Sequence, residues 1–217
     1  MFKKYSKTII LTCIITLLPI LLGIILWDQL PNQLPFHWGI DGKPDQYASR
    51  PVSVFVMPII LVFLQLLCVY ITGLDKRNKN QNTKIMSITL WIVPFISLFL
   101  NGFIYFVSIQ NTNDTFPFQF LPIFFGALFM LIGNYIPKCT HNHTIGIRIK
   151  WTLQNEQNWY ATHRFAGKVW LSCGFLLLFG AFLPNTFALI YMFSLLMIMV
   201  VSTIIYSYLY HNKQSNT

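Results

Sequence analysis

Charged residues are scarce in this sequence: they make up 10% of its 217 residues, and only six of them are acidic. Soluble globular domains carry about 25% charged residues and cover most of their apolar side chains in one core. A chain with 55% hydrophobic residues and a mean hydropathy of +0.56 leaves too much apolar surface for that arrangement. The composition therefore excludes an ordinary soluble domain and indicates a protein that resides in a membrane.

Ionisable side chains are also absent from the middle of the long apolar runs, where proton-coupled and ion-coupled carriers usually need one. This absence argues against a proton-driven transporter. The strongest polar groups in these runs are Gln65 and Asn101, which we expect to form hydrogen bonds between helices. The same two residues motivate the alternative hypothesis that the protein is a small membrane transporter.

Neither the cysteines nor the histidines form a recognised metal or catalytic motif. The four cysteines have no Cys-x-x-Cys spacing, so the sequence predicts no disulfide framework. Cys139, His141 and His143 could supply three metal ligands, yet no second cluster of matching spacing exists. His163 could act as a general base, yet no serine or cysteine nucleophile shares a motif with it. We therefore expect no enzyme activity, no metal and no cofactor.

Six apolar runs are each long enough to cross about 30 Å of hydrocarbon, which takes about 20 helical residues. They lie near residues 8–26, 52–73, 85–108, 117–136, 167–184 and 186–210. We predict an all-α fold, a polytopic transmembrane helix bundle with six spans. Its expected parts are residues 1–73 with two spans and the loop 27–51, residues 74–136 with two spans, and residues 137–217 with the loop 137–167 and two spans.

The net charge of +9 comes from basic residues that gather between the apolar runs. With six spans, every Lys and Arg except Lys43 and Arg50 falls on one side of the membrane. Basic loops stay in the cytoplasm by the positive-inside rule, so both termini are predicted to be cytoplasmic. This arrangement accounts for the positive charge without direct binding of nucleic acid.

The first loop predicted to lie outside, residues 27–51, is rich in proline, glycine and aromatic residues. Residues 35–38 can be extended, and residues 41–44 are a strong turn signal, so we expect a small ordered cap. His37, Asp41 and Asp45 share a helical spacing, but the glycines and proline between them argue against a metal site. The loop either anchors at the membrane interface through its aromatic residues or forms an outward recognition surface.

The loop 137–167 is predicted to be cytoplasmic and to begin with an extended segment near residues 145–151. Thr152 is then expected to cap a helix that runs through Ala166. A stripe at helical spacing predicts that this helix is amphipathic, lies at the inner membrane interface and bends at Gly167 into the fifth span. The stripe consists of Trp159, His163, Ala166 and Trp170. Such a helix would anchor in lipid or would dock a cytoplasmic partner.

Motifs in these two loops resemble known bacterial sequences. The outer motif is similar to a domain of unknown function in many bacterial membrane proteins, and it comprises Leu34-Pro35-Phe36-His37-Trp38, Gly42-Lys43-Pro44-Asp45 and Ser49-Arg50. The inner motif resembles the signature of the SdpI family of immunity proteins. It comprises Ile145-Gly146-Ile147-Arg148, Trp151-Thr152-Leu153, Trp159, Thr162-His163-Arg164 and Ala166-Gly167-Lys168. Ile149-Lys150 departs from the Thr-Pro pair that many relatives carry.

The SdpI resemblance implies a Gram-positive cell-membrane protein that gives immunity against a secreted peptide toxin. It also implies a signal transducer, because the best-known system holds a small winged-helix autorepressor at the membrane. On this resemblance, the residues expected to sense the toxin are His37, Gly42, Pro44 and Asp45. The residues expected to dock the repressor are Arg148, Trp151, Thr152, Trp159, His163, Arg164 and Lys168.

Overall fold

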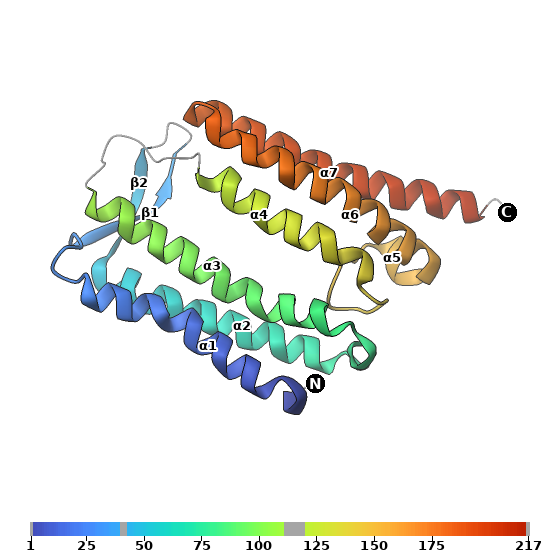
Figure 1. Cartoon of the computed structure of the whole chain (residues 1–217), viewed down its shortest axis with the longest axis horizontal. Helices are drawn as coiled ribbons and strands as arrows, with labels where there is room; N and C mark the ends of the chain where they lie inside the picture. Colours follow the sequence, from blue (N-terminus) through green and yellow to red (C-terminus); the bar gives the residue numbers. More distant parts are fainter. Residues whose placement is uncertain (1, 40–42, 111–119, 216–217) are drawn as a thin grey trace. The chain divides into compact units, whose positions relative to one another are not determined.

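The computed structural model describes residues 2–39, 43–110 and 120–215, and in this part of the chain the fold is helical apart from one hairpin (Figure 1). The helices are α1 (Phe2–Ile25), α2 (Met57–Leu74), α3 (Thr83–Ile109), α4 (Phe120–Tyr135), α5 (Lys150–Gln154), α6 (Glu156–Leu178) and α7 (Asn185–Ser215). The hairpin strands are β1 (Gln33–Trp38) and β2 (Pro44–Ser49).

Six of the described helical segments are long and apolar enough to cross a membrane, which confirms the predicted number of spans. They are Lys3–Ile25, Val52–Leu74, Thr83–Ile109, Phe120–Lys138, Glu156–Phe182 and Thr186–Gln214. Large apolar side chains on their surfaces are exposed, for example Ile25 at 76% and Phe182 at 85%. Such side chains are stable in lipid, so the fold is a polytopic transmembrane bundle.

The chain forms two compact units. The first contains Met1–Leu74 and Met86–Phe116, and the second contains Asp75–Ile85 and Pro117–Thr217. The loop Asp75–Ile85 thus belongs to the second unit. The helices before and after it, α2 and most of α3, belong to the first unit. This loop is the covalent link through which the units are joined at that point of the chain.

A buried polar cluster holds the helices of the first unit together. Gln65 on α2 accepts a hydrogen bond from the Thr16 hydroxyl at 2.8 Å and donates one to the Thr12 hydroxyl at 2.6 Å, both on α1. The predicted helix-to-helix bond of Gln65 is confirmed. Asn101 differs, because its Nδ2 donates to the Ser97 carbonyl at 2.8 Å on its own helix, α3. The predicted interhelical role of Asn101 is therefore wrong.

A π-helical turn at Val52–Val56 connects the hairpin to α2. Pro58 follows it, and a proline lacks the backbone N–H and crowds the carbonyl four residues earlier. The wider turn relieves this conflict, with the Met57 N–H bonded to the Val52 carbonyl. It also places Val54, which is 0% exposed, in the cluster that supports the hairpin.

In the second unit, α4 and α6 approach closely along a seam of glycines. A Cβ on Gly126 would lie 2.8 Å from the Gly174 carbonyl oxygen, and one on Gly133 would lie 2.6 Å from the Leu171 nitrogen. Gly167 and Gly174 meet α4 in the same way. Small residues let membrane helices pack through their backbones, so these four glycines define the α4–α6 contact.

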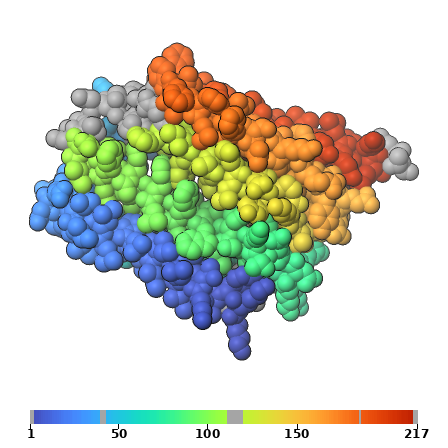
Figure 2. Space-filling model, viewed as in Figure 1, coloured from blue at the N-terminus to red at the C-terminus, as the bar shows by residue number. Residues whose placement is uncertain are grey.

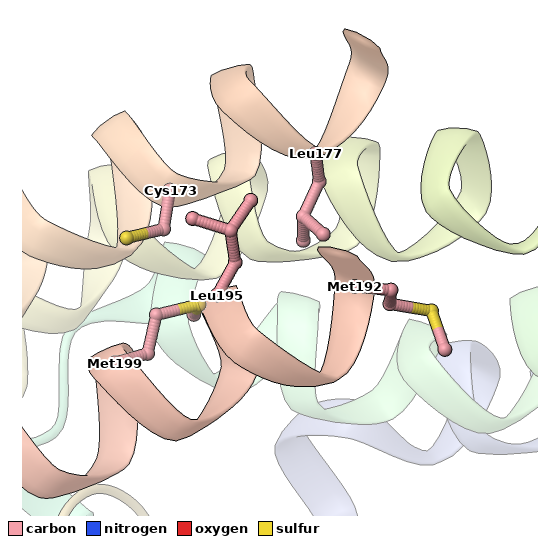
Figure 3. Close-up of a cluster of buried hydrophobic side chains, with 5 residues drawn as sticks. All are labelled: Cys173, Leu177, Met192, Leu195 and Met199. Atoms are coloured by element: carbon pink, nitrogen blue, oxygen red, sulfur yellow. The ribbon is translucent and has the colours of Figure 1, made fainter. Parts of the chain in front are cut away.

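α6 also packs against α7 through apolar side chains (Figure 3). The cluster consists of Cys173, Leu177, Met192, Leu195 and Met199, and the side chains of Leu177 and Leu195 point into the space between the two helices. Flexible methionines fill irregular space between two helices without strict shape complementarity. α6 packs against both α4 and α7, so it is the central helix of this unit.

Candidate functional site

The loop at residues 27–51 folds as an antiparallel hairpin, so the predicted ordered cap is confirmed and residues 35–38 are extended as expected. Its register pairs Leu34 with Ala48 and Trp38 with Pro44. Leu30 and Leu34 are 1% and 0% exposed and pack with Val54 and Tyr105. This apolar cluster attaches the base of the hairpin to the helices of the first unit.

Arg50 closes the base of the hairpin. Its Nε donates to the Pro31 carbonyl at 3.0 Å, and its Nη2 donates to the Asn32 side chain at 2.8 Å. The guanidinium also lies 5.2 Å from the centre of the Trp27 ring, a cation–π distance. The basic residue of the outer motif therefore has a structural role.

His37 and Asp45, two of the four residues predicted to sense a toxin, lie side by side on the hairpin. His37 Nδ1 and Asp45 Oδ1 are 2.6 Å apart, and the two side chains are 57% and 49% exposed. Pro44 is half-buried opposite Trp38. Asp41, the third proposed metal ligand, and Gly42, the fourth sensing residue, lie outside the described residues. The hairpin thus presents an exposed polar pair.

Asn142 organises the loop between α4 and α5. Its side chain is fully buried, and Nδ2 donates to the carbonyls of Thr140 and Ile145 at 2.8 Å each. Its Oδ1 accepts from the N–H groups of Thr144 at 2.8 Å and Ile145 at 2.6 Å. One amide therefore satisfies four backbone groups and folds the loop into a compact turn.

Trp159 and His163 hold this loop from α6. Both are 0% exposed, and their rings stack with centres 4.1 Å apart. Trp159 Nε1 donates to the Cys139 carbonyl at 2.9 Å. His163 Nδ1 donates to the Trp159 carbonyl at 2.8 Å, so its Nε2 can accept from the Ile147 N–H at 3.0 Å. This pair of bonds requires the neutral imidazole with its proton on Nδ1.

Gly146 shows how closely the loop approaches these rings. Its φ of 114° lies in the region that favours glycine. A Cβ at this position would lie 2.5 Å from His163 Nε2 and 3.0 Å from Trp159 Cζ2. The glycine of the inner motif is therefore required both by the backbone conformation and by the available space.

The long helix begins later than predicted, and a different residue caps it. Asn155 is the N-cap of α6, because its side chain accepts from the Asn158 N–H at 2.9 Å. The prediction that Thr152 caps this helix is wrong. Thr152 is buried, donates to the Ile147 carbonyl at 2.7 Å and accepts from the Ile149 N–H at 3.1 Å. It stabilises the start of the short helix α5 instead.

The predicted interfacial helix is also wrong. α6 runs without interruption from Glu156 through Gly167 to Leu178, so the chain does not bend at Gly167. Trp159, His163 and Ala166 are each 0% exposed, so the stripe packs against protein. An amphipathic spacing has the same appearance whether the apolar face meets lipid or another helix, which explains the error.

The loop between α2 and α3 is tied to the signature segment, which we define as residues 139–168. Asp75 Oδ2 accepts from the His143 N–H at 2.7 Å, and Asn78 Nδ2 donates to the Thr144 hydroxyl at 2.7 Å. Gln81, which is 6% exposed, accepts from the Thr140 N–H at 3.1 Å. These bonds join segments about 60 residues apart within the second unit.

Cys139 and His141, considered above as metal ligands, have other partners. Burial raises the pKa of the Cys139 thiol to about 11, so the thiol is neutral at physiological pH. His141 Nε2 donates to the Leu153 carbonyl at 3.1 Å, and its Nδ1 lies 3.3 Å from the Arg77 guanidinium. Among the described residues, no group of three His, Cys, Asp or Glu side chains could hold a metal ion.

The residues predicted to dock a partner divide by exposure. Arg148, Arg164 and Lys168 are exposed and Trp151 is half-buried, whereas the other three are buried: Thr152, Trp159 and His163. The buried members hold the signature segment in shape. In this conformation only the exposed and half-buried members can contact a partner.

Asn158 joins α6 to α7, and the sequence analysis missed it. It is fully buried, its Nδ2 donates to the Ser207 carbonyl at 2.9 Å, and its Oδ1 accepts from the hydroxyls of Thr162 and Ser207 at 2.8 Å each. No signal in the sequence pointed to it, because residue 158 fell in a predicted loop, where polar residues are ordinary.

Comparisons with known proteins agree with both loop motifs. Residues 138–207 match the model of the SdpI/YfhL protein family, and residues 14–62 match a domain of unknown function named DUF1648. The immunity protein SdpI of Bacillus subtilis (strain 168) is 27% identical over 211 residues, which cover 97% of each chain. No solved structure matches the chain.

Proposed function

Because residues 138–207 match the SdpI/YfhL family model and the chain is similar to an immunity protein along almost its whole length, we propose that this multi-pass membrane protein gives its cell immunity against a secreted peptide toxin. The observation that carries the proposal is the similarity to an immunity protein along 97% of both chains. The similarity includes both the segment with the hairpin and the signature segment. The proposed activity is binding of a peptide, without a chemical reaction.

The hairpin is the proposed site of toxin recognition. The positive-inside rule assigns it to the outer face, because the basic loops lie at the other ends of the spans. His37 and Asp45 are exposed and 2.6 Å apart, and Phe36 and Tyr47 are exposed beside them at 40% and 48%. A hydrogen-bonded polar pair flanked by aromatic side chains suits a peptide that has both polar and apolar residues.

The signature segment is the proposed site for holding a cytoplasmic winged-helix repressor. Arg148 is exposed at the end of the compact loop, and the half-buried Trp151 follows three residues later on α5. Arg148 Nη1 donates to the His143 carbonyl at 3.1 Å, which orders the side chain while the rest of its guanidinium remains available. A basic group on a rigid loop suits an acidic surface of a protein partner.

The loop Asp75–Ile85 gives a route by which toxin binding could affect this surface. It follows α2, the helix that leads from the hairpin, and it bonds to the signature segment through Asp75 and Gln81. A displacement of α2 along its axis would pull on both bonds. Transduction in this proposal therefore needs no contact between toxin and repressor.

The immunity proposal is tested in a strain that is sensitive to secreted peptide toxins made by the organism that carries this protein. Expression of the chain should raise survival, and His37→Ala/Asp45→Ala should lower it without lowering the amount of protein in the membrane. Gln46→Ala, at an exposed neighbouring position on β2, is the matched control. No protection by the wild type against any of these toxins would contradict the proposal.

Repressor docking is tested by imaging a fluorescent repressor in cells that express each variant. Arg148→Ala should release the repressor from the membrane on toxin exposure and leave survival unchanged. Lys84→Ala removes an exposed charge on the same predicted side, outside the signature segment, and should retain the repressor. Retention by the Arg148 variant would contradict docking while leaving immunity intact.

The alternative of a small transporter rests on Gln65 and Asn101, and both side chains are engaged in hydrogen bonds. A labelled toxin and vesicles that contain the protein separate the two functions. An immunity protein that binds its toxin sequesters the peptide without a gradient, whereas a transporter gives flux that follows the gradient.

A further inference from the structure

A groove of about 500 Å³ lies along the exposed side of α6 between α4 and α7. Gly133 and Pro137 line it from the α4 side, and Tyr206 lines it from α7. Figure 2 shows that α4 and α6 both reach the surface on the face drawn. We refer to this feature as the basic groove, because Arg164 and Lys168 of α6 lie in its lining.

The close packing of glycines creates the depth of the groove. α6 approaches the backbone of α4 at Gly133 and Gly167, so no side chain fills the space between them. On the other side, the rings of Phe165 and Tyr206 stack in parallel at 4.3 Å and form an apolar wall. Leu171 continues the apolar lining toward the middle of the span.

The two cations of the groove are unpaired. Arg164 and Lys168 are both exposed, and they lie one helical turn apart on the same face of α6. Neither forms an ion pair or a side-chain hydrogen bond with any residue in the described part of the chain. The described residues that line the groove include no acidic side chain. The groove is therefore complementary to an anion.

The position of α4 gives the depth of these cations in the membrane. The span Phe120–Lys138 has 19 residues. At about 1.5 Å per residue such a span is about 28 Å long, which just covers about 30 Å of hydrocarbon. A Cβ on Gly167 would overlap Pro137, so Lys168 is level with the last turn of this span and Arg164 is one turn further out. Both cations thus lie at the level of lipid phosphates.

We infer that the basic groove binds an anionic glycerophospholipid. Arg164 and Lys168 would hold the phosphate, and an acyl chain would lie over Phe165, Tyr206 and Leu171. A soluble anion would use the cations but not the apolar wall, whereas a lipid uses both. This inference goes beyond immunity, and it leaves Arg148 and Trp151, outside the groove, as the surface for a cytoplasmic protein.

The test measures lipid binding to the full-length protein in detergent by native mass spectrometry. The probes are dioleoylphosphatidylglycerol, which is anionic, and dioleoylphosphatidylcholine, which is zwitterionic; the first should bind more tightly. Arg164→Gln/Lys168→Gln should weaken binding of the anionic lipid about 30-fold, since each basic side chain near anionic lipid contributes about fivefold. Arg164→Lys/Lys168→Arg preserves both charges and should preserve the preference.

The matched control is Arg148→Gln/Lys150→Gln, which removes the same charge from exposed residues outside the groove and should keep the wild-type affinity. An equal loss in this control, or equal binding of the two lipids by the wild type, would overturn the inference. Competition by inorganic phosphate would assign the groove to a free anion. Since no toxin is present, a failure of the immunity proposal leaves this measurement unaffected.

Discussion

The hairpin and the signature segment are built on opposite principles. The hairpin exposes its polar pair, His37 and Asp45, and is held at its base by apolar contacts and Arg50. The signature segment buries Asn142, whose side chain bonds to the surrounding backbone. The difference indicates that substitutions in the hairpin change recognition, whereas most substitutions in the signature segment change the fold.

The strongest test of this difference is Gly146→Ala. The new methyl group would face His163 Nε2 at 2.5 Å with a φ of 114°, so the loop must move or refold. We expect a loss of about 2–4 kcal/mol of stability, from backbone strain and overpacking together. The measurement is thermal unfolding in detergent followed by circular dichroism.

Gly102→Ala is the matched control for this substitution, because nothing lies within 4 Å of a Cβ at Gly102. Alanine is favoured over glycine within a helix by up to about 1 kcal/mol, so this variant should be as stable as the wild type or more stable. If both variants lost the same stability, the requirement for glycine at position 146 would be refuted.

A smaller effect is expected where the signature segment meets the loop Asp75–Ile85. Gln81→Ala removes the acceptor of the Thr140 N–H and a donor to the Cys139 thiol. Opening of the loop should become about tenfold more frequent, which corresponds to about 1.4 kcal/mol for one lost buried hydrogen bond. The measurement is the rate of maleimide labelling of Cys139 in a protein without its other cysteines.

The exposed Gln154 supplies the control, and Gln154→Ala should leave the labelling rate unchanged.

Burial raises the pKa of Cys139 to about 11, so the folded protein retains the thiol proton above pH 9 while the unfolded chain loses it. Stability should therefore fall as the pH rises from about 9 to 11, and Cys139→Ala should remove this contribution. In the maleimide experiment, fast labelling of wild-type Cys139 at neutral pH would show that the loop around Cys139 is open and would contradict its burial.

The smallest effect is expected at the hairpin. Arg50→Ala removes the bonds to Pro31 and Asn32 at a half-buried position, which should cost about 1 kcal/mol, confined to the hairpin. Hydrogen exchange should become faster at residues 33–38 and 44–49 and remain unchanged in α6. Gln46→Ala serves as the control, and faster exchange throughout the chain would show that Arg50 supports more than the hairpin.

Hydropathy was sufficient to predict the six spans, because an apolar run of bilayer length has few other stable solutions. The hairpin was predicted only as an ordered cap, since its base packs against Tyr105, which lies far away in sequence. The packing of Trp159 and His163 was misassigned to lipid because helical spacing does not name the partner of an apolar face.

The glycine seam and the polar bonds of the signature segment were not predicted from the sequence. Gly126 and Gly133, like Gly167 and Gly174, are seven residues apart, so they form no Gly-x-x-x-Gly pair, although two helical turns place them on one face. Asn142 and Gln81 are ordinary polar loop residues in sequence. Only the fold shows that they meet around Cys139 and Thr140.

The place of the loop Asp75–Ile85 in the second unit has a consequence for biosynthesis. Its partners Thr140 and His143 are translated about 60 residues later, which takes several seconds at about 5–20 residues per second. During that interval Asp75 and Gln81 lack these two partners and have only local ones, the N–H groups of Arg77 and Asn82, while α1 to α3 already have one another. A nascent chain would thus complete the hairpin-bearing unit first and its signature segment last, so a truncated product would lack the segment without losing the hairpin.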